Sequence, residues 1–434
     1  MAYIATLEAA VAALEARVRE LEARGGEGAP RRMPGHKAEQ RPEGPAQPRK
    51  RRAQGYGRRR SAPTAQVVHA VAACPACGCA LGGGSRQRSR EVLELAAAPA
   101  VVSEHVYLVR RCPQCGRRCV PPPDLAGVVV GRQRLGVGLV SLIATLRIGG
   151  RWPYGQIQRY LASVHALRLS QGALVGAVRT VARQGKAAAA QIQEQVRASP
   201  VVHGDETGWR ENGRNGYVWT FSTPTARLFV RGSRAGRVID EVLGPAFAGV
   251  LVSDFYAAYD HVPTPKQRCW AHLLRDVHAL RQQYPADAAL AQWAKKLHRL
   301  YERGRTGATG PTLGTRAAQR QQWALRAKLQ AGLRALATVP AQEPPPVYRT
   351  LAGRLRRYEG ELFTFVTEPG VPADNNAAER SLRHLVIQRK ISGGTRSATG
   401  SATLMVANTL FGTWQAQGRD PLQACRDLLA HPQV

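Results

Sequence analysis

Hydrophobic residues change their spacing after Pro200, and this change constrains the fold more than any other feature of the sequence. A helical pattern gives way to three short runs typical of β-strands, at residues 201–207, 217–221 and 226–230. A helical stretch at 236–243 and a buried strand at 249–254 follow. In an RNase H-like fold, the order β-β-β-α-β places the first and fourth strands side by side and parallel. The sequence therefore predicts an α+β core of that type.

Acidic residues fall at two positions that such a sheet brings together. Asp205 lies in the first strand and Asp254 ends the fourth, so both should lie at one edge of the sheet. Two divalent cations close together need a further carboxylate to offset their repulsion, and Glu379 is the best candidate. Glu206 and Asp260 are competing ligands of second rank, and alternation along a strand turns Glu206 away from Asp205.

The surroundings of Glu379 also have two ordinary explanations. Asn376 and Glu379 have the spacing of a helix capping box, and Glu379 and Arg383 have the spacing of a surface ion pair. Taken alone, the segment favours these explanations. The combination of acid-bearing strands, a helix-borne glutamate, paired cysteines and positive charge favours catalysis.

The positive charge indicates a polyanionic partner. The 434 residues include 62 Lys+Arg against 30 Asp+Glu, a formal net charge of +32. Such an excess favours nucleic acid over a small metabolite, although an anionic membrane surface would also attract it. The apolar runs are too short to predict a membrane span, and Glu8, Glu15 and Glu20 do not fit a signal peptide. We expect a cytoplasmic, nucleoid-associated protein of about three domains.

Residues 1–24 carry three heptads that predict a coiled-coil helix, with core positions at Ile4, Leu7, Val11, Leu14, Val18 and Leu21. This pattern favours a homodimer or higher oligomer, and packing on the chain's own core is the alternative. Residues 25–66 form a basic linker that should be disordered in isolation. It is either a DNA-binding arm or a solubilising linker. Its candidate DNA contacts are Arg49, Lys50, Arg51, Arg52, Arg58, Arg59 and Arg60.

Two C-P-x-C-G motifs within residues 67–123 predict a zinc ribbon, and strand-like stretches between 101 and 109 suit one. The four thiolates that tetrahedral Zn²⁺ requires come from Cys74, Cys77, Cys112 and Cys115. Four free thiols are the alternative, and Cys79 and Cys119 are spare. A four-cysteine site leaves no open position for chemistry, so the ribbon is expected to be structural or to contact DNA.

Helical patterns dominate the segments around the predicted core. Within residues 124–196, one helix spans Tyr154 to Val164 and Ser170 caps the next, which fits a helix-turn-helix or any other helical hairpin. The core then comprises a first part (197–276), a helical insertion (277–365) and a second part with the Glu379 helix (366–410), before a helical tail (411–434). Candidate phosphate contacts near the acids are Arg380, Arg383, Arg389 and Lys390.

The segment Cys269-Trp270-Ala271-His272 has two interpretations. It is either a buried strand whose Cys269 and Trp270 belong to the core, or a site accessory in which His272 positions a phosphate or a catalytic acid.

Four segments together carry a specific resemblance. They are His203-Gly-Asp-Glu-Thr207, Ser253-Asp-Phe-Tyr-Ala-Ala-Tyr259, Cys269-Trp-Ala-His272 and Asp374-Asn-Asn-Ala-Ala-Glu-Arg380. These resemble successive landmarks of the DDE transposases of bacterial insertion-sequence family sixty-six, whose layout the heptad helix, ribbon and helical region also match. The departures are Gly204 and Gly208, where Ala and Pro are expected, and a glycine-rich segment at 391–394.

The resemblance implies a transposase that binds element ends and catalyses metal-dependent cleavage and strand transfer. Asp205, Asp254 and Glu379 take the three catalytic positions, with Mg²⁺ or Mn²⁺ as the expected cofactor beside Zn²⁺ in the ribbon. Accessory proteins of the same element are possible partners. Two alternatives remain, an RNase H-like nuclease without strand transfer and a non-enzymatic zinc-ribbon DNA-binding protein.

Overall fold

The computed structural model describes residues 66–83, 98–122, 124–131, 133–308, 314–339 and 346–431. The chain divides into two compact units, Met1–Leu95 and Ala96–Val434. The predicted coiled-coil helix and the basic linker up to residue 65 lie outside the described residues. The division between the units falls inside the segment predicted to form the ribbon (67–123). None of the described helices combines the length and the apolar character that crossing a membrane requires.

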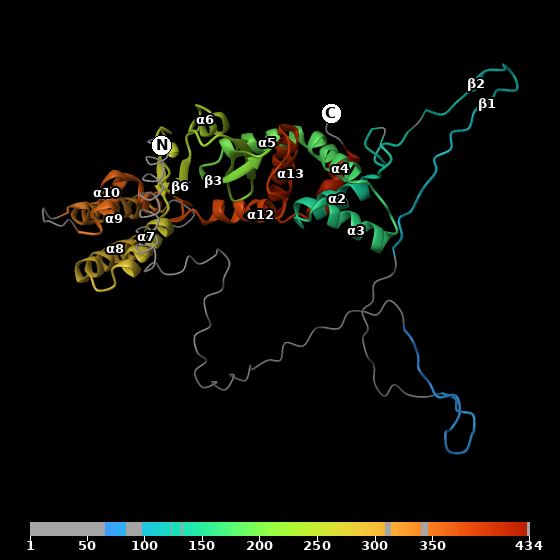
Figure 1. The fold of residues 1–434 in the computed structure, drawn as a ribbon, viewed down its shortest axis with the longest axis horizontal. Helices are drawn as coiled ribbons and strands as arrows, with labels where there is room; N and C mark the ends of the chain where they lie inside the picture. The colour runs from blue at the N-terminus through green and yellow to red at the C-terminus, as the bar shows by residue number, and fades with distance from the viewer. Residues whose placement is uncertain are drawn as a thin grey trace, which may run out of the picture. The chain divides into compact units, whose positions relative to one another are not determined.

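The second unit contains a five-stranded mixed sheet (Figure 1). Its strands are β3 (Val201–Glu211), β4 (Arg214–Ser222), β5 (Arg227–Gly232), β6 (Val250–Ser253) and β7 (Lys266–Arg268). The spatial order is β5-β4-β3-β6-β7. β3, β4 and β5 form an antiparallel meander, whereas β6 pairs in parallel with both β3 and β7. The first and fourth strands are therefore parallel neighbours, as the sequence order predicted.

Helices surround this sheet in four groups along the chain. The first group is α2 (Val137–Ile148), α3 (Tyr154–His165), α4 (Gln171–Gln184) and α5 (Lys186–Arg197). Between the strands lie α6 (Arg237–Leu243) and the short 3-10 helix η1 (Ala257–Tyr259). After β7 come α7 (Trp270–Gln283), α8 (Ala288–Thr306), α9 (Arg316–Ala337), α10 (Arg349–Arg357), η2 (Glu359–Glu361) and α11 (Thr364–Thr367). The last group is α12 (Asn376–Ser392), α13 (Ala398–Ala416) and α14 (Pro421–Ala430).

The predicted helical hairpin is present as α3 and α4. The hydroxyl of Ser170 accepts a hydrogen bond from the backbone N–H of Ala173 at 3.2 Å, which caps α4 as expected. α2 packs on α4. The pair is thus part of a helical bundle.

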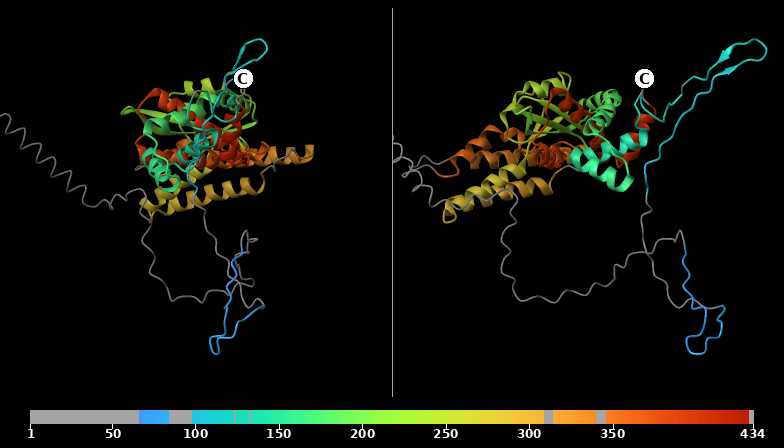
Figure 2. Two further views of the ribbon diagram at one scale, coloured as in Figure 1. Left: turned by 90° about the vertical axis from the view of Figure 1, so that its right-hand side faces the viewer. Right: turned by 45° about the vertical axis from the view of Figure 1, so that its right-hand side comes forward.

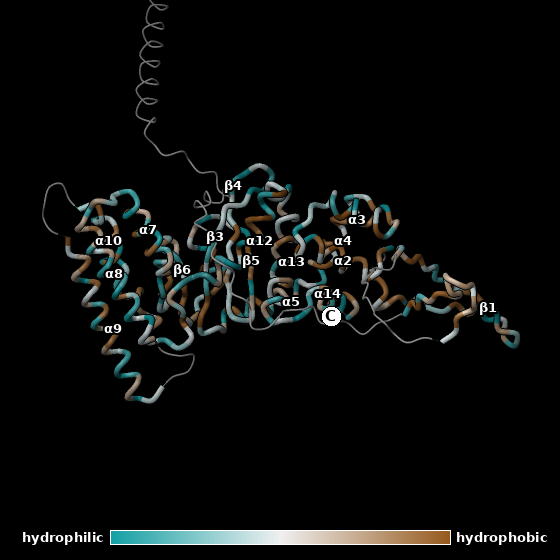
Figure 3. Tube along the Cα trace, turned by 90° about the horizontal axis from the view of Figure 1, so that it is seen from below, coloured by the Kyte–Doolittle hydropathy of each residue, from teal (hydrophilic) through white to brown (hydrophobic). Residues whose placement is uncertain are grey.

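The predicted insertion is largely helical, from α7 to α11. Hydrophobic and hydrophilic residues alternate every few positions along α8 and α9 (Figure 3), and their apolar sides join a second core that includes Trp293, Leu297 and Leu333. The expected boundaries at 276/277 and 410/411 are corrected. They fall inside α7 and α13, which continue to Gln283 and Ala416.

α13 covers one edge of the sheet. The backbone N–H groups of Arg227 and Phe229 on β5 donate to the hydroxyls of Thr413 and Thr409, both at 3.0 Å. An edge strand would otherwise present unpaired amides to other chains. Figure 2 shows helices packed around the sheet in two further views. The threonines of α13 thus complete the hydrogen bonding that β5 lacks on its outer side.

The strand-like residues before the second cysteine pair are not a strand. Residues 101–109 form no strand, and the first strand among the described residues is β1 (Arg110–Arg111), which forms a two-residue hairpin with β2 (Arg118–Cys119). Val101 and Val102 are each 90% exposed. A β-propensity pattern produces a strand only where a partner strand supplies hydrogen bonds, and here the segment has none among those residues.

Arg268 holds the end of β7 through buried charge contacts. Its side chain is fully buried, and it pairs with Asp260 and Glu361 at 2.6 Å each. It also donates to the backbone carbonyl of Asp254 at 2.9 Å. Removing one member of a buried ion pair leaves the others poorly compensated.

We expect Arg268→Ala to lower the free energy of unfolding by about 3 kcal/mol, because it leaves two carboxylates without their buried partner. Arg357→Ala is the matched control, since that side chain is 62% exposed and also pairs with Asp260 at 2.6 Å. It should cost less than about 1 kcal/mol. Urea unfolding followed by circular dichroism measures both, and equal losses would contradict the buried role.

Candidate active site

The pairing of β3 with β6 brings two aspartates to the same level of the sheet. His203 and Val252 are the last paired residues of the two strands. Asp205 and Asp254 each lie two residues farther on, and on parallel neighbouring strands such residues meet at one edge. The two aspartates therefore gather as the strand order predicted.

α12 is attached across the face of β3 to which Asp205 points. The fully buried Asn375, at its N-terminus, accepts a hydrogen bond from the His203 ring through its amide oxygen (3.0 Å) and donates through its amide nitrogen to the Gly204 carbonyl at 2.7 Å. Near its C-terminus, Arg389 donates to the Thr207 hydroxyl at 3.1 Å and to the Gly208 carbonyl. These contacts fix the helix that carries Glu379 relative to the strand that carries Asp205.

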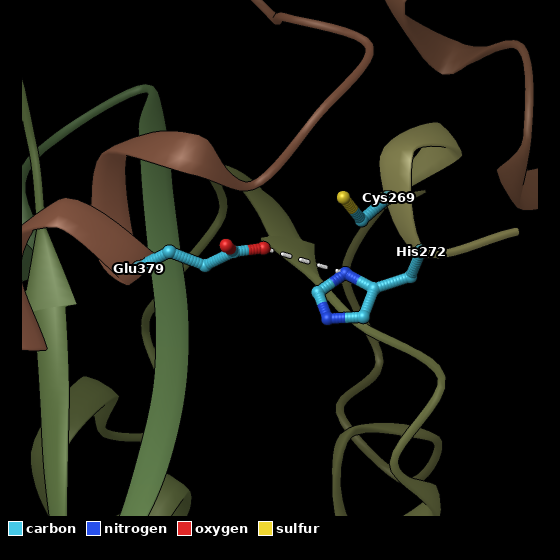
Figure 4. Close-up of side chains that lie close together, drawn as sticks. All are labelled: Cys269, His272 and Glu379. Atoms are coloured by element: carbon cyan, nitrogen blue, oxygen red, sulfur yellow. Dashed lines mark ion pairs between the residues drawn. The ribbon is translucent and has the colours of Figure 1, made fainter. Parts of the chain in front are cut away.

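Glu379 lies in the first turn of α12 and faces the start of α7 (Figure 4). Its Oε1 lies 3.6 Å from the Nδ1 of His272, and its Oε2 lies 4.0 Å from the guanidinium of Arg275. The ordinary explanations of this residue do not apply. The N-cap of α12 is Asn375, not Asn376, and Glu379 pairs across to α7 instead of along its own helix to Arg383.

The pKa of Asp205 shows that the three acids lie close enough to affect one another. Burial and, after it, the negative charges of Asp254, Glu206 and Glu379 together raise the pKa of Asp205 to about 8. Repulsion of this kind requires the carboxylates to be near one another in a poorly solvated place. A cation would relieve it, which is typical of a metal-binding site.

The competing acid Glu206 is engaged elsewhere. It is on the opposite face of β3 from Asp205, where its two oxygens accept from Arg234 at 3.1 Å and from Tyr259 at 3.2 Å. Burial, followed by the charge of Asp254, raises the pKa of Glu206, while the Arg234 and Tyr259 hydrogen bonds lower it. These contacts support its second rank.

Asp260 is likewise engaged, with Arg268, Arg357 and the Tyr358 hydroxyl. By contrast, the Oδ1 atoms of Asp205 and Asp254 accept only from backbone amides among the described residues, at 2.9 Å each. Among the described residues, Asp205 and Asp254 therefore lack the ion pairs with cationic side chains that Glu206 and Asp260 form.

Two of the unexpected glycines, Gly204 and Gly394, have steric reasons. A Cβ at Gly204 would lie 3.0 Å from the ring of Tyr259, which packs directly on the strand. At Gly208 it would lie 3.4 Å from Arg389, an ordinary van der Waals distance, so nothing in the structure explains the glycine there. Gly393 ends α12 in the left-handed conformation, with φ of 69°, and a Cβ at Gly394 would collide with the backbone of Arg210. The departures at Gly204 and Gly394 thus accommodate close contacts to β3.

The segment Cys269-Trp270-Ala271-His272 is not a strand. β7 ends at Arg268, Cys269 is the N-cap of α7 and Trp270 begins the helix. Cys269 and Trp270 are fully buried, as the core interpretation expected. Burial raises the pKa of the Cys269 thiol, against the lowering effect of backbone amides of His272, Asn375 and Ala271.

The two cysteine pairs form similar turns, one in each unit. In the first, Gly78 donates its backbone N–H to the Cys74 carbonyl at 2.8 Å, and in the second Gly116 donates to Cys112 at 2.9 Å. Both glycines have positive φ, 75° and 66°, which side chains rarely adopt. Backbone amides lower the pKa of Cys74 and Cys112. Cys77 and Cys115 are exposed, and so are the spare Cys79 and Cys119.

The basic residues predicted to contact phosphate differ in their accessibility. Arg380, Arg383 and Lys390 are exposed, whereas Arg389 is half-buried and bonded to β3. Arg389 therefore also has a structural contact that holds α12 against β3. The linker residues between 49 and 60 lie outside the described part of the chain.

Comparison with known proteins identifies the family. The model of the Transposase IS66 family matches residues 132–403, more than half of the chain and including all three acids. The chain belongs to the IS66 transposase family. This confirms the resemblance found in the sequence motifs. The chain is also 30% identical over 133 residues to the uncharacterized protein y4jO of Sinorhizobium fredii (strain NBRC 101917 / NGR234). That match covers 30% of this chain and 38% of the relative, so the chain spans well under two thirds of its length.

Two residues of this IS66-family site escaped the sequence analysis. Asn375 joins α12 to both β3 and Cys269, and Arg275 approaches Glu379 from α7. Asn375 lies in the Asp374-Asn-Asn motif, which was a signal for it, but a motif does not say which side chain each amide contacts. Arg275 follows His272 by three residues and so shares its helix face.

A raised pKa makes stability depend on pH. An aspartate whose pKa rises from 3.8 to about 8 on folding costs stability as the pH increases through that interval, because the unfolded chain releases the proton first. We expect Asp205→Asn to become progressively more stable than the wild type between pH 4 and pH 8, by up to about 1.4 kcal/mol per pH unit.

Urea unfolding without divalent cations, repeated at several pH values, measures this difference. Asp427→Asn, a half-exposed acid of α14 (54%), is the control and should follow the wild-type pH dependence. Saturating Mg²⁺ favours the ionised carboxylates of the wild type, so it should reduce the difference in stability between Asp205→Asn and the wild type. A constant difference between Asp205→Asn and the wild type across this pH range would contradict the assignment.

Proposed function

We propose that this chain is an insertion-sequence transposase that cuts and joins DNA with an RNase H-like core. The observation that supports this proposal is the placement of Asp205, Asp254 and Glu379 on β3, at the end of β6 and on α12. Burial, together with the negative charges of Asp254, Glu206 and Glu379, raises the pKa of Asp205 to about 8. Family membership supports the same conclusion.

The three acids fit a hard divalent cation. Their donors are all carboxylate oxygens, which Mg²⁺ or Mn²⁺ prefers, and Asp205, Asp254 and Glu379 would hold it. When bound, such ions activate a water or a DNA 3′-hydroxyl for in-line attack and stabilise the leaving oxygen. The chain's own residues supply geometry, because Asn375 and Arg389 hold α12 against β3 and so keep Glu379 near the aspartates.

The remaining parts of the chain have proposed roles in DNA binding and assembly. Four thiolates from Cys74, Cys77, Cys112 and Cys115 are suited to Zn²⁺, and the basic linker to DNA phosphates. The heptads of residues 1–24 are suited to joining two or more copies. Accessory proteins of the same element and a nucleoid-associated location belong to the same proposal.

Conservative removal of the acids tests the chemistry. Asp254→Asn and Glu379→Gln each keep shape but lose a ligand charge, so we expect strand cleavage and joining to fall at least about 1000-fold. The assay incubates the full chain with Mg²⁺ and DNA carrying the element's inverted repeats, and gel electrophoresis separates cut from joined products.

Glu206→Gln is the matched control, because its carboxylate is bound by Arg234 and Tyr259. It should retain most activity, and bound DNA in every variant should be comparable. Cleavage without joining by the wild type would indicate a nuclease, and binding alone a DNA-binding protein. Full joining activity of Asp254→Asn would overturn the proposal.

Exposed basic residues of α12 are expected to contact DNA. Arg383 and Lys390 are exposed and lie four and eleven positions after Glu379, on the same helix face. Each lost phosphate contact lowers the slope of log K against log salt by about 0.9, so Arg383→Ala/Lys390→Ala should lower it by about 2. Fluorescence anisotropy at several salt concentrations measures the slope. Arg237→Ala, which replaces an exposed residue of α6, should leave the slope unchanged. Equal slopes for the wild type, the double variant and Arg237→Ala would exclude the contact.

A further inference from the structure

Cys269, His272 and Glu379 converge where the start of α7 meets the start of α12 (Figure 4). Cys269 is the N-cap of α7 and His272 lies in its first turn, three residues later, so both side chains leave the same side of the helix. Glu379 approaches from the first turn of α12. The Cys269 sulfur, a His272 ring nitrogen and a Glu379 oxygen all lie within 4.8 Å of one another.

Two atoms of this cluster are buried without a counterpart. The Nδ1 of His272 and the Oε1 of Glu379 are 3.6 Å apart, beyond hydrogen-bonding distance. Within the described part of the chain, neither atom has a hydrogen-bond partner. Buried polar atoms are nearly always paired, because an unpaired one loses its contacts with water and gains nothing. The spacing of these two atoms suits a bound atom between them.

We propose that Cys269, His272 and Glu379 bind one thiophilic divalent cation, with Zn²⁺ as the expected ion. Thiolate sulfur, imidazole nitrogen and carboxylate oxygen are the ligand types of zinc sites, whereas Mg²⁺ prefers oxygen alone. Zn–N and Zn–O bonds at a tetrahedral angle place their ligand atoms about 3.4 Å apart. This is close to the 3.6 Å between His272 and Glu379. The sulfur distances, within 4.8 Å, would close by about 1 Å on binding.

The surroundings of the cluster support a charged ligand set. The Cys269 sulfur accepts the backbone N–H of Asn375 at 3.1 Å, an outer contact that orients a metal-bound thiolate. One thiolate and one carboxylate balance the charge of a divalent ion. The second oxygen of Glu379 faces Arg275 at 4.0 Å and is not needed by this ion. Binding would therefore hold Glu379 in place and leave its other oxygen free to bind the cation that Asp205 and Asp254 would hold.

Cobalt(II) is a suitable probe, because Co²⁺–thiolate bonds absorb in the near ultraviolet and all-oxygen sites do not. The full chain is loaded with one equivalent of Zn²⁺ to fill the predicted ribbon and then titrated with Co²⁺ without DNA. We expect one further Co²⁺ with thiolate absorption. Cys269→Ser should abolish that absorption, and His272→Ala should weaken Co²⁺ binding at least about 100-fold. Cys425→Ser, also fully buried but on α14, should match the wild type.

The proposal is overturned if the wild type shows no additional thiolate absorption, or if Cys269→Ser retains it. Circular dichroism checks the fold of each variant. If Cys269→Ser does not fold, His272→Ala provides the test, because the His272 side chain is 27% exposed. Wild-type affinity of His272→Ala for Co²⁺ would exclude the site. The proposal goes beyond the transposase chemistry. Because the titration contains no DNA, its failure and a failure of strand cleavage are separate results.

Discussion

The parallel pairing of β3 with β6 is the constraint on which the candidate site depends. Three backbone pairs, ending at His203 and Val252, set a register in which Asp205 and Asp254 each lie two residues beyond the last β3–β6 pair. A shift by one residue would turn Asp205 to the opposite face of β3, where Glu206 now meets Arg234 and Tyr259. The register thus decides which of two neighbouring acids faces α12 and which becomes a structural ion-pair partner.

The third acid depends on contacts that are far apart in the sequence. Asn375 bonds to His203 and Gly204, Ser381 accepts from Ser222 at 2.9 Å, and Arg389 bonds to Thr207 and Gly208. These three attachments run along the length of α12. A helix fixed at both ends and near its middle has little freedom to carry its first turn away from the strand. The position of Glu379 is therefore a property of the whole helix and not of its local sequence.

Local features were predictable from the sequence, whereas features that depend on distant partners were not. The Ser170 cap, the strand order and the helical insertion follow from spacing and turn chemistry over a few residues, and all are present. The strand expected near Val101 is absent, because a high β-propensity forms a strand only where another strand pairs with it. The predicted capping box with Asn376 as N-cap is absent, because the N-cap of α12 is Asn375 and the side chain of Asn375 bonds to β3. Neither outcome was available from residues adjacent in the chain.

The junction between β7 and α7 explains why one short motif carries both core and site residues. Arg268 ends the strand with its side chain among buried acids, and the chain turns into a helix at Cys269. Trp270 then points into the core of the insertion, where its ring nitrogen donates to the Leu362 carbonyl. His272 faces Glu379. Because successive residues at a helix start point in different directions, three positions suffice to join the sheet, the insertion and the acidic site. The packing of the insertion around Trp270 and the contact of His272 with the third acid thus both start from the first turn of α7.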